Sequence, residues 1–169
     1  MLTVLIETRN DEEALARTLA SLVGAAVEGI VRDVIVCDSG STDQTHRVAE
    51  HAGCHYVTEG VAAGIRQAKG EWLLMLEPGA RLADGWTESV IDHVSRQSMP
   101  ARFSRARGER RALFTRMFSG QSALAEGLVI RKGQAVALSK SAASAEAVAR
   151  GLASRRLEAE IRVAEPRRK

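Results

Sequence analysis

Residues that could do chemistry gather where an apolar run of the sequence stops at Asp38. The four residues before it are apolar and mostly β-branched, which is typical of a buried parallel strand. Gly40 then permits a tight turn, and Ser41 with Gln44 three residues later has the pattern of a helix capping box. We therefore expect Asp38 and Ser39 at the carboxyl end of a strand, where open α/β sheets bind ligands. The alternative is a capped turn whose carboxylate only accepts hydrogen bonds from loop amides.

A second carboxylate follows the apolar run Trp72 to Leu76, which predicts another buried strand. Glu77 comes directly after this run, and Pro78-Gly79 forms a competent turn whatever Glu77 does, so a purely structural role is open for this segment.

Arginine is concentrated in a third segment, Arg102 to Arg116, which holds six arginines with Phe103 and Phe114 between them. Such a segment could hold phosphate groups, contact an anionic membrane surface or balance the charge of a diphosphate. The alternative is a solvated loop and an exposed helix face, the commoner outcome for a charge run. Nucleic acid is not an expected partner, because no recognition motif accompanies the charge.

Alternating strand and helix patterns over the first hundred residues predict an α/β fold with a mostly parallel sheet covered on both faces. Expected strands lie at 2–6, 34–36, 54–57, 72–76, 101–104 (an edge strand), 127–131 and 161–163. Expected helices run from an N-cap at Asn10 to near Gly24, then over 42–51, 59–69, 86–96 and 144–157.

Composition is that of an ordinary globular domain, with 169 residues, 45% hydrophobic residues and a mean hydropathy of −0.13. No apolar run approaches the roughly 20 residues that span a bilayer, and no basic region precedes the first apolar run. Cys37 and Cys54 have no metal-ligand spacing, so we expect reduced thiols in a cytoplasmic protein.

Four passages, in this order, resemble glycosyltransferase family 2, whose members have the GT-A fold. They are I-E-T-R-N-D-E-E at Ile6, V-C-D-S-G-S-T-D-Q-T at Val36, A-G-I-R-Q-A-K-G-E-W-L-L-M-L at Ala63 and G-L-V-I-R at Gly127. The resemblance covers residues 2–98 well and the remainder poorly. It implies a three-layer α/β/α GT-A-like fold with a reduced C-terminal part. It also implies transfer of a sugar, with inversion, from a nucleotide-diphosphate sugar to an acceptor, usually with Mn²⁺ or Mg²⁺.

Carried over position by position, the resemblance places Thr8 and Asn10 in the first nucleotide-contacting loop. Arg9 stands where the family often has an aromatic or apolar residue, and its planar guanidinium could also stack on a base. Asp38 matches the carboxylate that recognises the base or the ribose, with Ser39 beside it.

Three functional positions differ from the family pattern. The Asp-x-Asp motif that holds the metal is replaced by Glu77-Pro78-Gly79, which leaves Glu77 as the single candidate for metal or catalytic contact. An Arg-Asn pair near the diphosphate is replaced by Val61-Ala62. The Glu-Asp pair that supplies the general base is best matched by Glu146-Ala147, so Glu146 is the candidate base. The alternative for Glu146 is an ordinary glutamate in the first turn of a helix.

The resemblance divides the chain into a nucleotide-sugar-binding half, residues 1–98, and a reduced acceptor-side half of the same domain, residues 99–169, with a basic tail at 165–169. The first hypothesis is a family 2-like glycosyltransferase acting on an unknown acceptor. The alternative is a non-catalytic GT-A-fold binding or scaffolding protein that has lost the metal and base motifs. Peripheral contact with the inner face of an anionic membrane through Arg102–Arg116 is a further expectation.

Overall fold

The computed structural model describes residues 1–106 and 122–165. Its strands are β1 (Leu2–Thr8), β2 (Val31–Asp38), β3 (His55–Val57), β4 (Trp72–Leu76), β5 (Arg81–Leu82), β6 (Ala101–Arg105), β7 (Leu128–Arg131) and β8 (Arg155–Arg162). Its helices are α1 (Glu12–Ala20), α2 (Val23–Val27), α3 (Thr45–His51), α4 (Val61–Gln67), α5 (Trp86–Arg96), α7 (Lys132–Leu138) and α8 (Ala145–Ala149).

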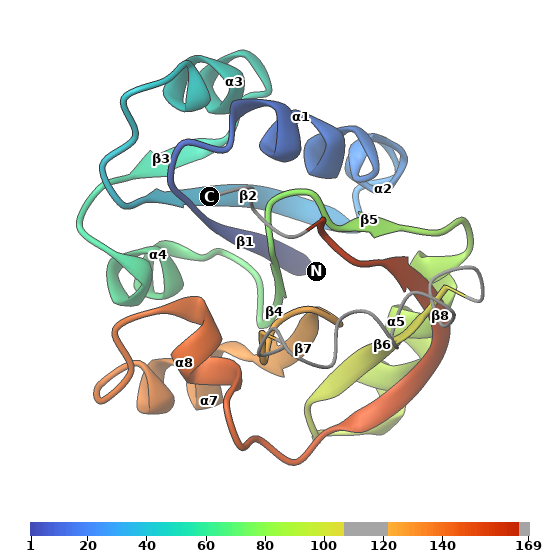
Figure 1. Cartoon of the computed structure of the whole chain (residues 1–169). Coiled ribbons are helices and arrows are strands. Elements are labelled where there is room, and N and C mark those ends of the chain that lie inside the picture. The colour runs from blue at the N-terminus through green and yellow to red at the C-terminus, as the bar shows by residue number, and fades with distance from the viewer. Residues whose placement is uncertain (107–121, 166–169) are drawn as a thin grey trace.

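These strands form one curled sheet in the order β3-β2-β1-β4-β7-β6-β8-β5. Strands β3, β2, β1 and β4 run parallel, and β7 pairs with β4 in the antiparallel direction. Helices α1, α2 and α3 lie on one side of the parallel strands, and α4, α7 and α8 lie on the other (Figure 1). The expected three-layer α/β fold is therefore confirmed, with a mixed sheet in its second half.

Alternation along the parallel strands divides the core into two apolar clusters, one on each face of the sheet. In β1, Val4 and Ile6 pack with the cluster under α1 and α5, whereas Leu5 packs with the cluster under α4, α7 and α8. All three side chains are completely buried. A strand buried on both faces reads as a continuous apolar run, which explains why β1 and β4 were visible in the sequence.

Neither cysteine is in a disulfide: Cys37 is buried and Cys54 is half-buried. Burial, followed by the charge of Glu7, raises the pKa of Cys37 to about 12, and burial raises the pKa of Cys54 to about 11. Both groups therefore stay protonated thiols at neutral pH, as inert buried cysteines do. Among the helices of residues 1–106 and 122–165, none combines the length and apolar character needed to cross a membrane.

One expected helix was wrong in its second half. The run Ser144 to Leu157 was predicted as helical throughout, but α8 ends at Ala149 and Arg155 already belongs to β8. The buried side chains of β8 are Leu157 and Ile161, with the half-buried Ala159 packed between them. That spacing is the two-residue period of a strand, and pairing with β6 favours it over the helix propensity of the Glu and Ala residues.

Two further expectations were also wrong. The strand predicted over Ala101–Ser104 is not an edge strand, because β6 lies between β7 and β8. The helix expected to reach Gly24 is broken after Ala20 into α1 and α2. Neither α7 nor the two-residue strand β5 was expected from the sequence.

The amino ends of the parallel strands are tied together by a buried polar cluster. The hydroxyl of Thr3 donates to the carboxylate of Asp33, which also accepts from the amide of Lys69 at 3.2 Å. The Gly70 amide donates to the Thr3 hydroxyl at 2.8 Å. A Cβ atom on Gly70 would lie 2.7 Å from the backbone nitrogen of Thr3 and 2.8 Å from the carbonyl oxygen of Met1. Only glycine allows β1 to approach this close.

We predict that Gly70→Ala lowers the free energy of unfolding by about 1–3 kcal/mol, because backbone atoms of β1 would have to move. Gly24→Ala is the matched control, since its added Cβ meets no atom within 4 Å. It sits inside α2 and should instead raise stability by about 0.5–1 kcal/mol. Urea unfolding measures both variants. Equal stability of Gly70→Ala and the wild type would contradict the close approach.

Candidate functional site

A cleft of about 1200 Å³ opens at the carboxyl ends of β1, β2 and β4. The parallel register brings the ends of these strands level, with Thr8 of β1 opposite Asp38 of β2. Residues from the loops after these strands, from the start of α8 and from the end of β8 line it. The predicted site residues among them are Thr8, Arg9, Asn10, Ser39, Glu77 and Glu146. Residues far apart in the sequence thus share one cavity.

The loops after β1 and β2 are held together by hydrogen bonds across the mouth of the cleft. The Asn10 amide donates to the Ser41 hydroxyl at 2.8 Å, and the Asn10 side-chain oxygen accepts from the Thr42 amide at 2.7 Å. The Ser39 amide donates to the Thr8 carbonyl at 2.9 Å. Asn10 has a φ of 53°, a left-handed conformation that asparagine tolerates better than most residues. Its expected role as an N-cap was wrong, because its side chain reaches the neighbouring loop.

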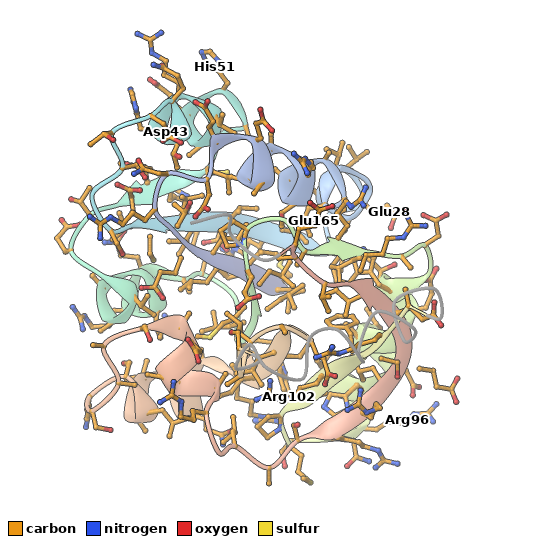
Figure 2. All side chains as sticks on the ribbon, viewed as in Figure 1. Glu28, Asp43, His51, Arg96, Arg102 and Glu165 are labelled. Carbon is orange, nitrogen blue, oxygen red and sulfur yellow. The ribbon has the colours of Figure 1, made fainter. Side chains whose placement is uncertain are left out.

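Helices α1 and α3 cap each other at the same place. The Glu12 amide, at the start of α1, donates to the Asp43 carboxylate at 3.2 Å. In return the Gln44 amide, at the start of α3, donates to the Glu12 carboxylate at 2.8 Å. Asp43 also accepts from the Thr45 amide at 3.0 Å, so it caps two helices (Asp43 is labelled in Figure 2). The capping box predicted for Ser41 and Gln44 was wrong, because α3 begins only at Thr45.

Asp38 does not line the cleft and is 4% exposed. Its carboxylate accepts from the amides of Gly40 and Ser41 at 3.0 and 2.8 Å and from the Ser41 hydroxyl. Burial alone would raise the pKa of this carboxyl, but hydrogen bonds from Ser41, Tyr56 and Gly40 outweigh it and lower the pKa. The loop amides therefore occupy the carboxylate that the resemblance assigns to nucleotide recognition, and Asp38 fixes the path of Ser39.

Glu77 extends from the end of β4 into the cleft and is half-buried. Within the described residues its carboxylate has no hydrogen-bond or ion-pair partner, so it is available to a ligand. The same described part of the chain contains no group of three or more His, Cys, Asp or Glu side chains that could hold a metal ion. The described side chains therefore do not form a metal site by themselves, and a metal ion bound at Glu77 would also need oxygen atoms from a bound substrate.

Glu146 lies in the first turn of α8 and lines the cleft. Its carboxylate pairs with Arg150 at 3.0 Å, and its side chain is 43% exposed. The position of this turn is set from β1, because the Ala145 amide donates to the Glu7 carboxylate at 2.8 Å. The Ser144 hydroxyl accepts from the Ala147 amide at 3.1 Å and completes the cap. Glu146 is thus both a first-turn glutamate and a cleft residue.

Two of the arginines that line the cleft were not singled out from the sequence. Besides Arg9, and Arg105 from the arginine-rich segment, they are Arg17 and Arg81. Arg17 pairs with Glu13 at 3.0 Å and Arg105 with Glu126 at 2.9 Å. Arg17 and Arg81 stand apart in the sequence, so no local motif indicates them.

The arginine-rich segment Arg102–Arg116 is described only at its start. The Arg102 guanidinium donates to the Ala149 carbonyl at 2.6 Å and to the Ala123 carbonyl (Figure 2). Burial lowers its pKa. The guanidinium groups of Arg102 and Arg105 therefore pair with groups of the described fold. The rest of the segment lies outside the described residues, so membrane contact stays a prediction.

We predict that Asp43→Ala lowers the free energy of unfolding by about 1–2 kcal/mol at neutral pH, because two helix starts lose an acceptor. Burial acts to raise the pKa of Asp43, but hydrogen bonds from Thr45 and Glu12 lower it overall. A depressed folded pKa stabilises above the ordinary carboxyl value of 3.8, and that stabilisation is lost as the pH falls through the folded pKa. The difference from wild type should therefore shrink in acid.

The control is Asp92→Ala, which removes an exposed carboxylate that pairs with Arg96 within α5. Urea unfolding between pH 3 and 7 checks both variants, and the control should change stability by roughly 0.5 kcal/mol or less. An Asp43→Ala variant as stable as this control at neutral pH would show that the reciprocal caps contribute nothing.

Comparisons with known proteins agree with this geometry. The sequence model of Glycosyl transferase family 2 matches residues 3–99. TarS of S. aureus (residues 1–349) superposes with a TM-score of 0.66 at 17% identity, over 96% of this chain and 60% of that one. Glucosyl-3-phosphoglycerate synthase from Mycobacterium tuberculosis, solved with Mn²⁺, UDP and glucosyl-3-phosphoglycerate, gives 0.55 at 16% identity over 79% and 57%. Mannosyl-3-phosphoglycerate synthase from Rubrobacter xylanophilus gives 0.59 at 13% identity over 79% and 54%.

These structures show the fold, and this chain spans between 54% and 60% of the length of each of the three. A search of curated proteins finds no match. The family match covers more than half of the 169 residues, including the first three of the four passages that carried the resemblance. The chain belongs to glycosyl transferase family 2 and has the GT-A fold.

Proposed function

We propose that this chain binds a nucleotide-diphosphate sugar in the cleft and transfers the sugar, with inversion, to a hydroxyl group of an acceptor. The single observation that carries the proposal is the cleft itself. It brings the loop Thr8–Asn10 and Ser39 together with Glu77, which follows the end of β4, and with Glu146, at the start of α8. Glucosyl-3-phosphoglycerate synthase from Mycobacterium tuberculosis, which has this fold, is known in complexes with UDP and either glucosyl-3-phosphoglycerate or phosphoglyceric acid.

The nucleotide would lie against the loops after β1 and β2. Arg9 is exposed at the cleft and its guanidinium has no partner within the described residues, so it can stack on a base or pair with a phosphate. Ser39 lines the same cleft, and the Asn10 side chain holds the two loops in register. The Thr8 side chain is buried and its hydroxyl donates to the Asp11 carboxylate at 3.1 Å, so Thr8 would contact the nucleotide only by exchanging that partner. Asp38 would take part through Ser39 or by exchanging a loop donor for a base or ribose group.

In the transfer, the acceptor oxygen attacks the anomeric carbon as the bond from that carbon to the diphosphate oxygen breaks. Glu146 would accept the proton of the attacking hydroxyl. The bonding electrons leave with the nucleoside diphosphate, whose added negative charge needs positive charge beside it. Arg9 and Arg17 are cations at the β1–α1 side of the cleft that could supply it.

A divalent ion is the family's usual source of that charge, and Mn²⁺ or Mg²⁺ remains part of the proposal. Glu77 would be its carboxylate ligand, and diphosphate oxygens and water would supply the remaining positions. No transfer step is assigned to the ion, because the described residues offer no cluster that holds it without the nucleotide.

The state of the metal and base positions favours a second candidate, a non-catalytic GT-A-fold binding or scaffolding protein. The turn Glu77-Pro78-Gly79 offers one carboxylate where the family has two, and Glu146 is paired with Arg150. Such a protein would bind the nucleotide sugar without turning it over. Cytoplasmic location, with or without membrane contact, is proposed for either candidate.

For binding, we predict that titration calorimetry with UDP- and GDP-sugars, each with and without Mn²⁺, detects at least one donor. Arg9→Ala should weaken that affinity by about tenfold, the effect of one charge-assisted contact. Arg47→Ala is the control, because Arg47 is exposed on α3 and does not line the cleft. Asp38→Ala should weaken binding as well. If the wild type binds no donor under any of these conditions, the proposed function is wrong.

For catalysis, we predict slow hydrolysis of the bound donor, with water in place of the acceptor. Glu146→Gln should lower its rate by about a hundredfold or more, because the general base is lost, while donor affinity stays unchanged. Glu77→Gln should abolish any Mn²⁺-dependent part. Glu50→Gln on the exposed side of α3 is the control. Donor binding without hydrolysis by the wild type would favour the scaffolding candidate.

A further inference from the structure

Two arginines stand directly opposite each other where β5 pairs with β8. Arg81 is in register with Arg162, and the next pair along, Leu82 and Ile161, is buried. Because side chains alternate between the faces of a strand, the two arginines project from the same face, away from the core. Both are exposed. Directly opposed residues have Cβ atoms about 4.5–5.5 Å apart, so one small anion can reach both guanidinium groups.

Neither guanidinium makes a hydrogen bond or an ion pair within residues 1–106 and 122–165. Like charges placed directly opposite each other on neighbouring strands are destabilising. The pair therefore costs the fold stability and gains nothing from the described protein groups around it. An external anion would remove the repulsion and use both groups.

Arg81 faces the cleft, and its strand is held firmly in place. Strand β5 follows the turn that begins at Glu77, and Arg81 is its first residue. The Gly79 amide in that turn donates to the Ala14 carbonyl at 3.0 Å and to the Thr18 hydroxyl at 2.8 Å. After the strand, the Ala83 amide donates to the Glu160 carbonyl at 3.0 Å. Contacts on both sides of β5 thus fix the base of the Arg81 side chain before any ligand arrives.

We propose that Arg81 and Arg162 form an anion site that takes a phosphate or carboxylate group of the acceptor. Planar guanidinium groups bind both kinds of anion through paired hydrogen bonds. The inference rests on the proposed function, and it narrows the acceptor to an acidic molecule. Donor contacts are proposed on the loops after β1 and β2, whereas Arg81 lines the cleft and Arg162 does not, so the pair lies at the margin of the cleft. The pair is therefore assigned to the acceptor, and the second titration below tests this assignment against the donor diphosphate.

Two carboxylates could compete for these arginines. Glu160 lies two residues before Arg162 on the same face of β8, and Glu165 lies beyond the end of β8 and also lines the cleft (Figure 2). No hydrogen bond or ion pair joins either carboxylate to Arg81 or Arg162 in the described structure. An anionic ligand group would thus meet two cations whose charges are not already neutralised.

The test follows the arginine Nε–H signals of ¹⁵N-labelled protein by NMR while glycerol phosphate, glycerate or neutral glycerol is added. Signals of Arg81 and Arg162 are assigned by their loss in Arg81→Gln and Arg162→Gln. Both signals should shift in a saturable way with glycerol phosphate and glycerate and stay in place with glycerol. Each Gln variant should bind about tenfold more weakly, and Arg81→Lys should keep part of the affinity. Arg47→Gln is the control and should change nothing.

A second titration, on protein saturated with the nucleoside diphosphate that it binds, separates the acceptor from the donor. Shifts that persist support the acceptor site, and shifts that vanish assign the pair to the donor diphosphate and overturn the proposal. If the protein binds no donor, the anion titration without nucleotide still tests the arginine pair. Failure of the proposed function can therefore be distinguished from failure of the anion site. The absence of a shift of both signals with both anions also overturns the proposed anion site.

Thermal unfolding without ligand adds a readout of a purely structural role. Arg81→Gln and Arg162→Gln should be as stable as the wild type or more stable, because each removes a like-charge repulsion. Lower melting temperatures in both variants would assign the arginines to the fold and contradict the anion site.

Discussion

The constraint on which this molecule depends is the parallel pairing of β1 with β2 on one side and β4 on the other. Val4, Leu5 and Ile6 are completely buried, so β1 cannot slip in register without moving apolar side chains to the wrong face. The pairing brings the ends of three strands to one edge of the sheet. Every candidate residue from the first half of the chain is placed by that edge.

The loops around the cleft are held in place by hydrogen bonds between polar groups of the protein. Asp38, Asp43, Glu12 and Glu7 each accept hydrogen bonds from backbone amides of the loops or helix starts. These carboxylates shape the cleft and do not occupy it as free charges. Glu77, Arg9 and Arg81 differ from them because they have no partners within the described residues. A ligand would therefore meet a rigid frame with a few unpaired charges.

Strands buried on both faces could be predicted from the sequence, because their continuous apolar runs are a local signal. Capping of α1 by Asp43 and of α3 by Glu12 could not, since Glu12 and Asp43 are 31 residues apart and each looks like an ordinary residue at the start of its own helix. The helix expected over Ser144–Leu157 failed for a related reason. The alternation of Leu157, Ala159 and Ile161 is a strand signal, but the helix-forming residues between them favoured a helix. Pairing of β8 with β6, which the sequence does not show, favours the strand.

Of the candidate site, the place of the residues after β1, β2 and β4 in the cleft could be predicted, and so could that of Glu146, because each stands at a motif position at a strand end or helix start, although the motifs at Glu77 and Glu146 are incomplete. Their assigned roles remain predictions. The opposed pair Arg81 and Arg162 could not be predicted, because the two residues are 81 positions apart in the chain and meet only through the register of β5 with β8. Glu7 was also missed, although it follows an apolar strand directly, as Asp38 and Glu77 do.

The central claim is that the cleft at the carboxyl ends of β1, β2 and β4 is a nucleotide-sugar site. A crystal structure of the protein soaked with a uridine or guanosine diphosphate sugar and Mn²⁺ tests it most directly. The account predicts the nucleoside against Thr8–Asn10 and Ser39, with the diphosphate directed toward Glu77. A donor bound elsewhere on the molecule, or a cleft that stays empty at a donor concentration that saturates the protein in solution, would contradict it.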